Sequence, residues 1–114
     1  KKNLEELEKK GLIKIQTVPE YSAHNAHMFY LKARDLEERT ALISYLKEQG
    51  VQAVFHYIPL HTAPAGRRYG VFAGEDRYTT RESERLVRLP LYYNLSLEQA
   101  DYVIDKVNAF YKER

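Results

Sequence analysis

The segment at residues 26–57 reads AHMFYLKARDLEERTALISYLKEQGVQAVFHY. Residues 26–33 are rich in aromatic and apolar side chains on both faces, which is typical of a central β-strand. Asp35 then stands at the position of a helix N-cap, with a glutamate three residues later as in a capping box, and apolar residues recur at helical spacing over residues 36–49. Residues 51–57 again indicate a strand. The segment therefore predicts a strand–helix–strand unit.

The residues before this unit add one helix and one strand. Residues 1–10 are polar and favour a helix, and Gly11 is a natural stop for it. We expect this stretch to be the tail of an interdomain helix that begins upstream. Residues 12–16 indicate a short strand, and residues 17–25 carry a proline, a serine and an asparagine that favour a connection.

The residues after the unit begin with a long irregular segment. Residues 58–76 contain two prolines and three glycines, and a loop of this length inside a compact domain usually has a function. Thr79, with a glutamate three residues later, predicts a capped short helix over residues 80–87. Ser96, with a glutamine at the same reciprocal position, predicts a last helix over residues 97–111.

These elements predict an α+β fold in one domain spanning residues 1–114. We expect a small, mainly antiparallel sheet of about three strands, covered on one face by helices. The expected strands are residues 12–16, 26–33 and 51–57, and the covering helices are residues 36–49 and 97–111.

Composition excludes several classes of function. The chain has 114 residues and no cysteine, which excludes disulfides, thiolate metal sites and cysteine nucleophiles. Its 18 basic and 16 acidic residues nearly balance, so we expect binding neither to nucleic acid nor to membranes. No long apolar run or export signal is visible, and we expect a cytoplasmic protein. The chain starts at Lys1 rather than Met, which predicts a piece of a longer protein.

The four histidines are the first candidates for chemistry. His24 and His27 are three residues apart, a spacing that does not converge on a metal in a strand, so no metal site is expected. His56 and His61 lie where a predicted strand runs into the irregular segment, which is where sites sit on α/β scaffolds. From spacing alone, the alternative is that His56 fills a sheet position and His61 lies on a surface loop.

Other reaction classes have weaker support. The chain has no G-x-S-x-G elbow and no phosphate-binding loop. A small hydrolase using His56 or His61 would lack a neighbouring nucleophile and orienting acid. Arg81, Arg85 and Arg88 would share one face of a helix and could bind phosphate, but the interspersed glutamates favour a solvated, salt-bridged face.

Four motifs together resemble a known family. They are N-A-H-x-F-Y at residues 25–30, H-Y-x-P-L-H at 56–61, G-E-D-R-Y-T-T-x-E-S-E-R-L at 74–86 and L-P-L-x-Y-N-L-S at 89–96. In this combination the chain resembles the C-terminal part of the nucleotide-sugar aminotransferases of the DegT/DnrJ/EryC1/StrS group. The longer strings resemble the branch of the family that acts on dTDP-sugars.

The resemblance implies a pyridoxal-phosphate enzyme of the aspartate-aminotransferase fold that works as a homodimer. It would transfer an amino group from glutamate to a dTDP-4-keto-6-deoxyhexose. This chain would be the small domain only, inactive alone and without bound cofactor, because the family's Schiff-base lysine and cofactor cradle belong to an N-terminal large domain that is missing here. No catalytic or cofactor-binding residue is therefore assigned, and the expected substrate-binding residues are His56, Tyr57, His61 and His27.

Two alternatives accompany this interpretation. The main one is a free-standing α+β module that binds a ligand or a partner without catalysis, and the small hydrolase ranks behind it. The chain also holds ten tyrosines, which we expect to pack partly against the missing large domain.

Overall fold

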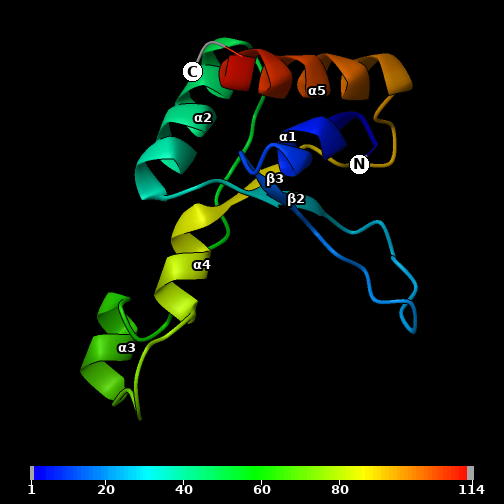
Figure 1. Cartoon of the computed structure of the whole chain (residues 1–114). Helices are drawn as coiled ribbons and strands as arrows, with labels where there is room; N and C mark the ends of the chain where they lie inside the picture. The colour runs from blue at the N-terminus through cyan, green and yellow to red at the C-terminus, as the bar shows by residue number, and fades with distance from the viewer. Residues whose placement is uncertain (1, 113–114) are drawn as a thin grey trace.

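The computed structural model describes residues 2–112, and its elements are short strands and helices (Figure 1). In chain order they are the 3₁₀ helix η1 (Lys2–Leu4), α1 (Glu5–Lys9), β1 (Lys14–Ile15), β2 (Phe29–Lys32), α2 (Leu36–Glu48), α3 (Pro64–Tyr69), α4 (Thr79–Arg85), β3 (Leu86–Leu89) and α5 (Leu97–Lys112).

The three strands form one antiparallel sheet in the order β1-β2-β3. Leu31 in β2 pairs with Ile15 on one side and Val87 on the other, and all three side chains are buried. Because successive side chains of a strand alternate between faces, the neighbouring pair of Tyr30 and Arg88 lies on the opposite face. The sheet thus has an apolar face and an open, more polar face.

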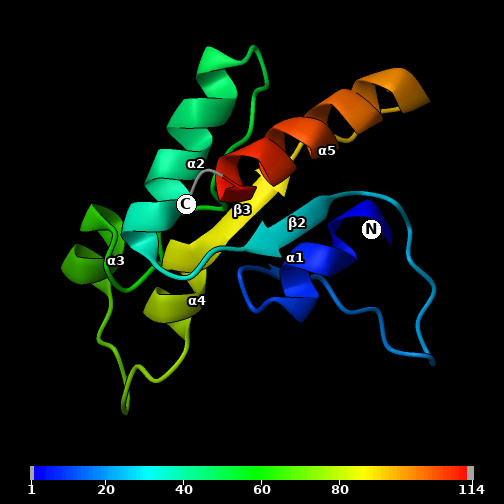
Figure 2. The same cartoon turned by 45° about the horizontal axis from the view of Figure 1, so that its top comes forward.

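Helices α1, α2 and α5 cover the apolar face (Figures 1 and 2). Leu42 and Leu46 of α2 and Val107 of α5 are fully buried against the sheet residues in one hydrophobic cluster. The prediction of an α+β fold with a small antiparallel sheet covered by helices is confirmed.

Helices α2 and α5 run antiparallel, and each begins at a predicted cap. Asp35 accepts a hydrogen bond from the Glu38 amide at 2.8 Å, and the Ser96 hydroxyl accepts one from the Gln99 amide at 3.1 Å. In the reciprocal bond, the Gln99 side chain accepts a hydrogen bond from the Ser96 amide at 3.0 Å. Both helix starts predicted from these local patterns are confirmed.

The prediction of a sheet strand at residues 51–57 is wrong. This segment makes a single bridge, in which Val54 pairs antiparallel with Arg88. Val51 and Ala53 bury their side chains in the core, so the alternating apolar pattern is real, but residues 55–57 leave the sheet edge. The third strand of the sheet is β3, which lies between β2 and this segment.

The prediction of a helix over residues 80–87 is also wrong in its extent. Helix α4 ends at Arg85, and the chain turns into β3 at Leu86, whose ψ of 128° is extended. The predicted capping box fails too, because Thr79 lies inside the helix and Tyr78 precedes it without a side-chain cap. Pairing with β2 decides this region, since four residues are too few to form a strand by themselves.

Residues 58–76 are not wholly irregular, because they contain α3. Together with α4, this helix forms an arm that projects from the sheet and the covering helices (Figure 1). Gly66 lets α3 pack tightly, since a Cβ there would lie 1.6 Å from the Leu60 carbonyl oxygen. At the N-terminus, the predicted helix over residues 1–10 is observed as η1 followed by α1, while Lys1 lies outside the described residues.

Candidate functional site

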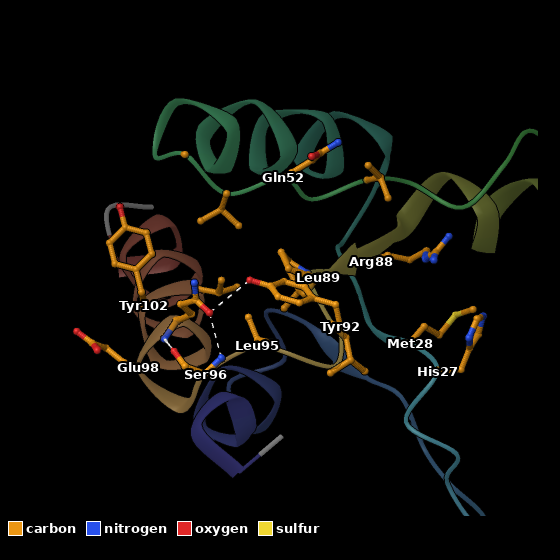
Figure 3. A pocket seen from close by; sticks show the side chains of 17 residues that line it. His27, Met28, Gln52, Arg88, Leu89, Tyr92, Leu95, Ser96, Glu98 and Tyr102 are labelled. Carbon is orange, nitrogen blue, oxygen red and sulfur yellow. Dashed lines mark hydrogen bonds between the residues drawn. The ribbon is translucent and has the colours of Figure 1, made fainter.

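A groove of about 1020 Å³ runs between the end of α2, the end of β3 and the first half of α5 (Figure 3). Val51 and Val54 line it from the segment that follows α2, and Leu89 lines it from β3. Figure 3 shows Glu98 and Tyr102 at one end, and His27, Met28 and Arg88 at the other. The groove therefore joins the α5 side of the domain to the open face of the sheet.

The α5 end of the groove is ordered by hydrogen bonds. Gln99 accepts from the Ser96 amide and, at 3.4 Å, from the Tyr92 hydroxyl. The Tyr102 hydroxyl donates to the Gln49 carbonyl at 3.0 Å, at the C-terminal end of α2. These groups are already paired within the chain, which leaves the opposite end as the better place for a ligand.

At the opposite end, Arg88 is fixed by backbone pairing on both sides. It pairs with Tyr30 of β2 and exchanges two hydrogen bonds with Val54, at 2.7 and 3.1 Å. Its side chain leaves the apolar core, which receives Val87 and Leu89 instead. The Arg88 guanidinium lies 3.4 Å from the Nδ1 atom of His56, and no carboxylate within residues 2–112 forms an ion pair with it.

Two residues beside this end have a left-handed backbone conformation. Tyr57, which follows His56, has a φ of 59°, and Ala26, which precedes His27, has a φ of 54°. Such conformations cost a non-glycine residue about 1–3 kcal/mol, and they concentrate where a protein positions functional groups. The Tyr57 carbonyl is held by a hydrogen bond from the Ser83 hydroxyl at 3.0 Å.

Two of the four predicted binding residues, His56 and Tyr57, lie beside Arg88, and a third, His27, lines the groove. The rings of His56 and Tyr57 contact each other edge to face with centroids 4.8 Å apart, and His56 contacts Arg88. His27 lines the groove together with Arg88 and is exposed. Sequence reasoning considered Arg88 only as part of a solvated arginine face of a helix, whereas the structure places it on β3. The available signal was the alternation of Val87, Arg88 and Leu89 just before a proline.

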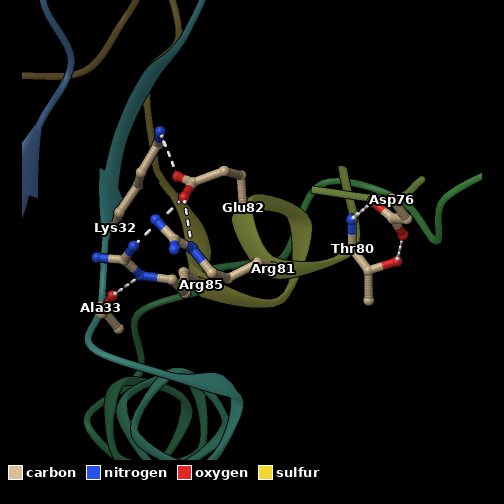
Figure 4. Close-up of polar contacts among 7 residues, drawn as sticks. All are labelled: Lys32, Ala33, Asp76, Thr80, Arg81, Glu82 and Arg85. Atoms are coloured by element: carbon tan, nitrogen blue, oxygen red, sulfur yellow. Dashed lines mark hydrogen bonds and ion pairs between the residues drawn. The ribbon is translucent and has the colours of Figure 1, made fainter. Parts of the chain in front are cut away.

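The fourth predicted residue, His61, lies in a separate polar network on the arm. Its Nε2 atom is 2.8 Å from Asp76 and 3.3 Å from the Thr80 hydroxyl, which itself donates to Asp76 (Figure 4 draws the Asp76–Thr80 pair). The expectation that His61 has no acid nearby is thus wrong. The hydrogen bonds from Thr80, foremost that of its hydroxyl, and the one from His61 hold the pKa of Asp76 below its usual range.

The arrangement around His61 does not form a hydrolytic triad. In a triad the acid and the nucleophile contact different nitrogens of the imidazole. Here Asp76 and Thr80 meet at the same nitrogen, and the His61 ring packs on Phe72 with centroids 4.4 Å apart. The network therefore links the loop before α4 to the turn before α3 and lacks the acid–imidazole–hydroxyl order of a triad.

The three arginines expected on one helix face are divided by the structure. Arg81 and Arg85 of α4 pair with Glu82, which also binds Lys32 of β2 at 2.7 Å (Figure 4). The hydrogen bond from Lys32, together with these arginines, lowers the pKa of Glu82. Arg88 lies on β3 and takes no part in this cluster.

A bound metal or a complete cofactor site has no support in the described residues. Within residues 2–112, no group of three or more His, Asp or Glu side chains is placed to hold a metal ion. No lysine lines the groove, so its residues do not fit a pyridoxal-phosphate site with a Schiff-base partner. In the part of the chain that the structure covers, no helix is long and apolar enough to cross a membrane.

Comparison with known proteins identifies the relatives of this chain. The dTDP-3-amino-3,6-dideoxy-alpha-D-galactopyranose transaminase of Aneurinibacillus thermoaerophilus is 31% identical over 104 residues, which are 90% of this chain and 27% of that protein. The structure of NtdA from Bacillus subtilis, with its cofactor PMP, has a TM-score of 0.77 at 32% identity and covers 97% of this chain and 26% of that chain. The chain thus spans about a quarter of their length.

A third structure shares the fold. The aminotransferase TlmJ of Streptoalloteichus hindustanus has a TM-score of 0.81 at 23% identity, covering 98% of this chain and 30% of that chain. The family model described as the DegT/DnrJ/EryC1/StrS aminotransferase family matches residues 1–108. Because this match spans nearly the whole sequence, the chain belongs to the DegT/DnrJ/EryC1/StrS aminotransferase family.

Proposed function

We propose that this chain is the C-terminal small domain of a pyridoxal-phosphate-dependent aminotransferase. The whole protein, a homodimer, transfers an amino group from glutamate to a dTDP-4-keto-6-deoxyhexose. Membership of the family supports the reaction, and the name of the Aneurinibacillus relative supports a dTDP-sugar as substrate. The cofactor and the Schiff-base lysine belong to the N-terminal large domain, which agrees with the share of its relatives that the chain spans.

Within this enzyme the chain forms one wall of the substrate cleft. The observation that carries this assignment is the group of His56, Tyr57 and Arg88, in which Arg88 lies on the open face of the sheet and Tyr57 has a strained backbone. Its role is to bind and orient the substrate, with His27 at the same end of the groove. A substrate contact by His61 stays a prediction, since that residue lies in the separate network on the arm.

The large domain would cover the arm and the open side of the sheet. The arm carries apolar side chains that the described residues do not bury, among them Leu60 at 76%, Tyr69 at 78% and Val71 at 97% exposure. Exposed apolar surface of this kind marks a contact with another part of a protein. The chain on its own is therefore expected to self-associate or to bind apolar dyes, and a monodisperse, dye-silent monomer would count against this packing.

The test uses the full-length protein that carries this chain. With pyridoxal phosphate, glutamate and dTDP-4-keto-6-deoxyglucose, it should produce 2-oxoglutarate and a dTDP-amino sugar, both measured by mass spectrometry. The His56→Ala variant should raise KM for the sugar nucleotide by about tenfold, the effect of losing one charge-assisted contact. The matched control is His24→Ala, because His24 contacts Gln16 and the Ala26 amide, away from Arg88.

A second measurement tests whether this chain or the large domain carries the lysine that binds the cofactor. Borohydride reduction of the 114-residue chain with pyridoxal phosphate should give no stoichiometric adduct. A single specific adduct at one lysine would overturn the assignment of this chain as the part without the cofactor. A full-length protein without transaminase activity on any dTDP-keto sugar would overturn the proposed reaction.

A further inference from the structure

We propose that Arg39 of α2 is a positioning residue, which holds the Phe55 ring and thereby fixes the adjoining His56 and Tyr57. The role of these two residues in binding the sugar nucleotide rests on the proposed function, whereas the hold itself is a property of this chain. Three observations carry the proposal: the contact between Arg39 and Phe55, the strained turn that follows Phe55, and the uncompensated charge of Arg39.

Arg39 contacts the segment after α2 through the face of an aromatic ring. Its guanidinium carbon lies over the Phe55 ring, 4.9 Å from the ring centroid, which is the geometry of a cation–π contact. The Phe55 side chain is 45% exposed and lies outside the hydrophobic core cluster. Because core packing does not hold this ring, the guanidinium is the group placed to orient it.

The residues that follow Phe55 leave the sheet edge in a strained conformation. The backbone bridge to β3 lies before Phe55, and Tyr57 has a φ of 59°. A left-handed conformation of this kind persists only where the surrounding structure holds it. The Ser83 hydroxyl of α4 holds the Tyr57 carbonyl at 3.0 Å, and Arg39 holds Phe55 from the side of α2. His56 therefore lies between two residues that are each held by a helix.

Arg39 makes this contact although its charge is poorly compensated. Its Nε atom is buried and has no hydrogen-bond partner among the described residues, and none of the ion pairs within residues 2–112 includes it. Burial lowers the pKa of Arg39, and the Glu84 carboxylate of α4 opposes this shift. A methionine would fill much of the same space without a buried charge, so the stability of the fold does not by itself explain an arginine here.

The test compares Arg39→Met with the wild type in the full-length protein. KM for the dTDP-keto sugar should rise about 3- to 10-fold, as expected for one lost cation–π contact, while kcat and KM for glutamate stay within about twofold. The midpoint of urea unfolding should not fall, because the variant removes a poorly compensated charge. A purely structural role would instead lower this midpoint and leave KM for the sugar unchanged.

The matched control is Arg77→Met, which removes an equal charge from an exposed arginine that pairs with Glu75. It should change neither KM nor the urea midpoint. An unchanged KM for the sugar in Arg39→Met, or an equal rise in Arg77→Met, would overturn the positioning role.

Two further variants connect Arg39 to Phe55. Arg39→Lys keeps a cation over the ring and should hold KM within about twofold of the wild type. Phe55→Leu removes the face of the ring and should raise KM as much as Arg39→Met does, which keeps the test open if Arg39→Met does not fold. The double variant should raise KM no further than either single change, since each removes the same cation–π contact. Additive effects would contradict the hold.

A measurement without activity separates this inference from the proposed reaction. Histidine labelled with carbon-13 at Cε1 gives an NMR signal for the His56 ring, which is assigned by its loss in His56→Gln. That signal should shift in Arg39→Met and stay in place in Arg77→Met, with the His24 signal as reference. An unmoved His56 signal would overturn the hold even in an active enzyme. An inactive wild type whose His56 signal depends on Arg39 would overturn the reaction and leave the hold standing.

Discussion

Replacing Tyr111 by phenylalanine tests how much a buried hydrogen bond between α5 and α2 stabilises the fold. The Tyr111 hydroxyl donates to Glu38 at 2.9 Å, and both side chains are buried, at 6% and 5% exposure. At the other end of the same helix pair, the Tyr102 hydroxyl donates to the Gln49 carbonyl at 3.0 Å. The Tyr102 side chain is 46% exposed. The chain thus offers the same substitution once in the core and once at the surface.

The two variants should differ because the environments of the lost bonds differ. A hydrogen bond to a charged group contributes about 1.5–3 kcal/mol, and its loss leaves the Glu38 carboxylate buried with one donor fewer. The Arg34 amide still donates to the same oxygen at 3.1 Å, so the lower part of this range applies, about 1.5–2 kcal/mol for Tyr111→Phe. Water can replace the Tyr102 hydroxyl at the surface, and Tyr102→Phe should cost roughly 0.5 kcal/mol.

Urea denaturation of the 114-residue chain, followed by far-UV circular dichroism, measures both free energies of unfolding. The slope against urea should not change, because neither variant alters the surface that unfolding exposes. Combining Tyr111→Phe with Glu38→Gln should cost less than the sum of the two single changes, since the first removes the donor of this bond and the second removes the charge of its acceptor. Equal losses in the two tyrosine variants, or a larger loss in Tyr102→Phe, would refute the reasoning.

Three further predictions follow from local features. Ser96→Ala removes the N-cap of α5 and should lower the free energy of unfolding by about 1 kcal/mol in the same urea assay; no change would contradict the cap. Because the folded pKa of Asp76 is depressed, its contacts contribute stability above the ordinary carboxyl pKa, about 3.9, and lose it as the pH falls below that value. A carbon NMR titration should show the pKa of Asp76 rising towards the ordinary value in Thr80→Val, and an unmoved pKa would refute the dominant role of that hydroxyl. Gly66→Ala should displace α3, because the new Cβ would meet the Leu60 carbonyl oxygen. Amide hydrogen exchange should therefore become faster in the arm, while the urea midpoint of the whole chain stays near that of the wild type. An equal loss of exchange protection throughout the chain would show that the arm unfolds together with the core.

Sequence alone predicted the fold class and the two long helices, because their signals are local. A capping side chain reaches an amide three residues away, and an apolar stripe needs only helical spacing to be visible. Asp35 and Ser96 illustrate the first of these, and the buried Val103 and Val107 of α5 the second. The predicted His56 and Tyr57 also rest on a local signal, the end of an apolar run before an irregular segment.

Tertiary structure alone decided the third strand, the arm and the charge partners of the site. Leu86–Leu89 is a strand because β2 supplies hydrogen-bonding partners from residues more than 50 positions earlier in the chain, and no pattern within four residues encodes that pairing. The same pairing places Arg88 opposite Tyr30 and beside His56, while Glu82 is taken by other cations. Side-chain chemistry is thus readable from the sequence, but a charge without a partner becomes visible only when the folded chain shows what surrounds it.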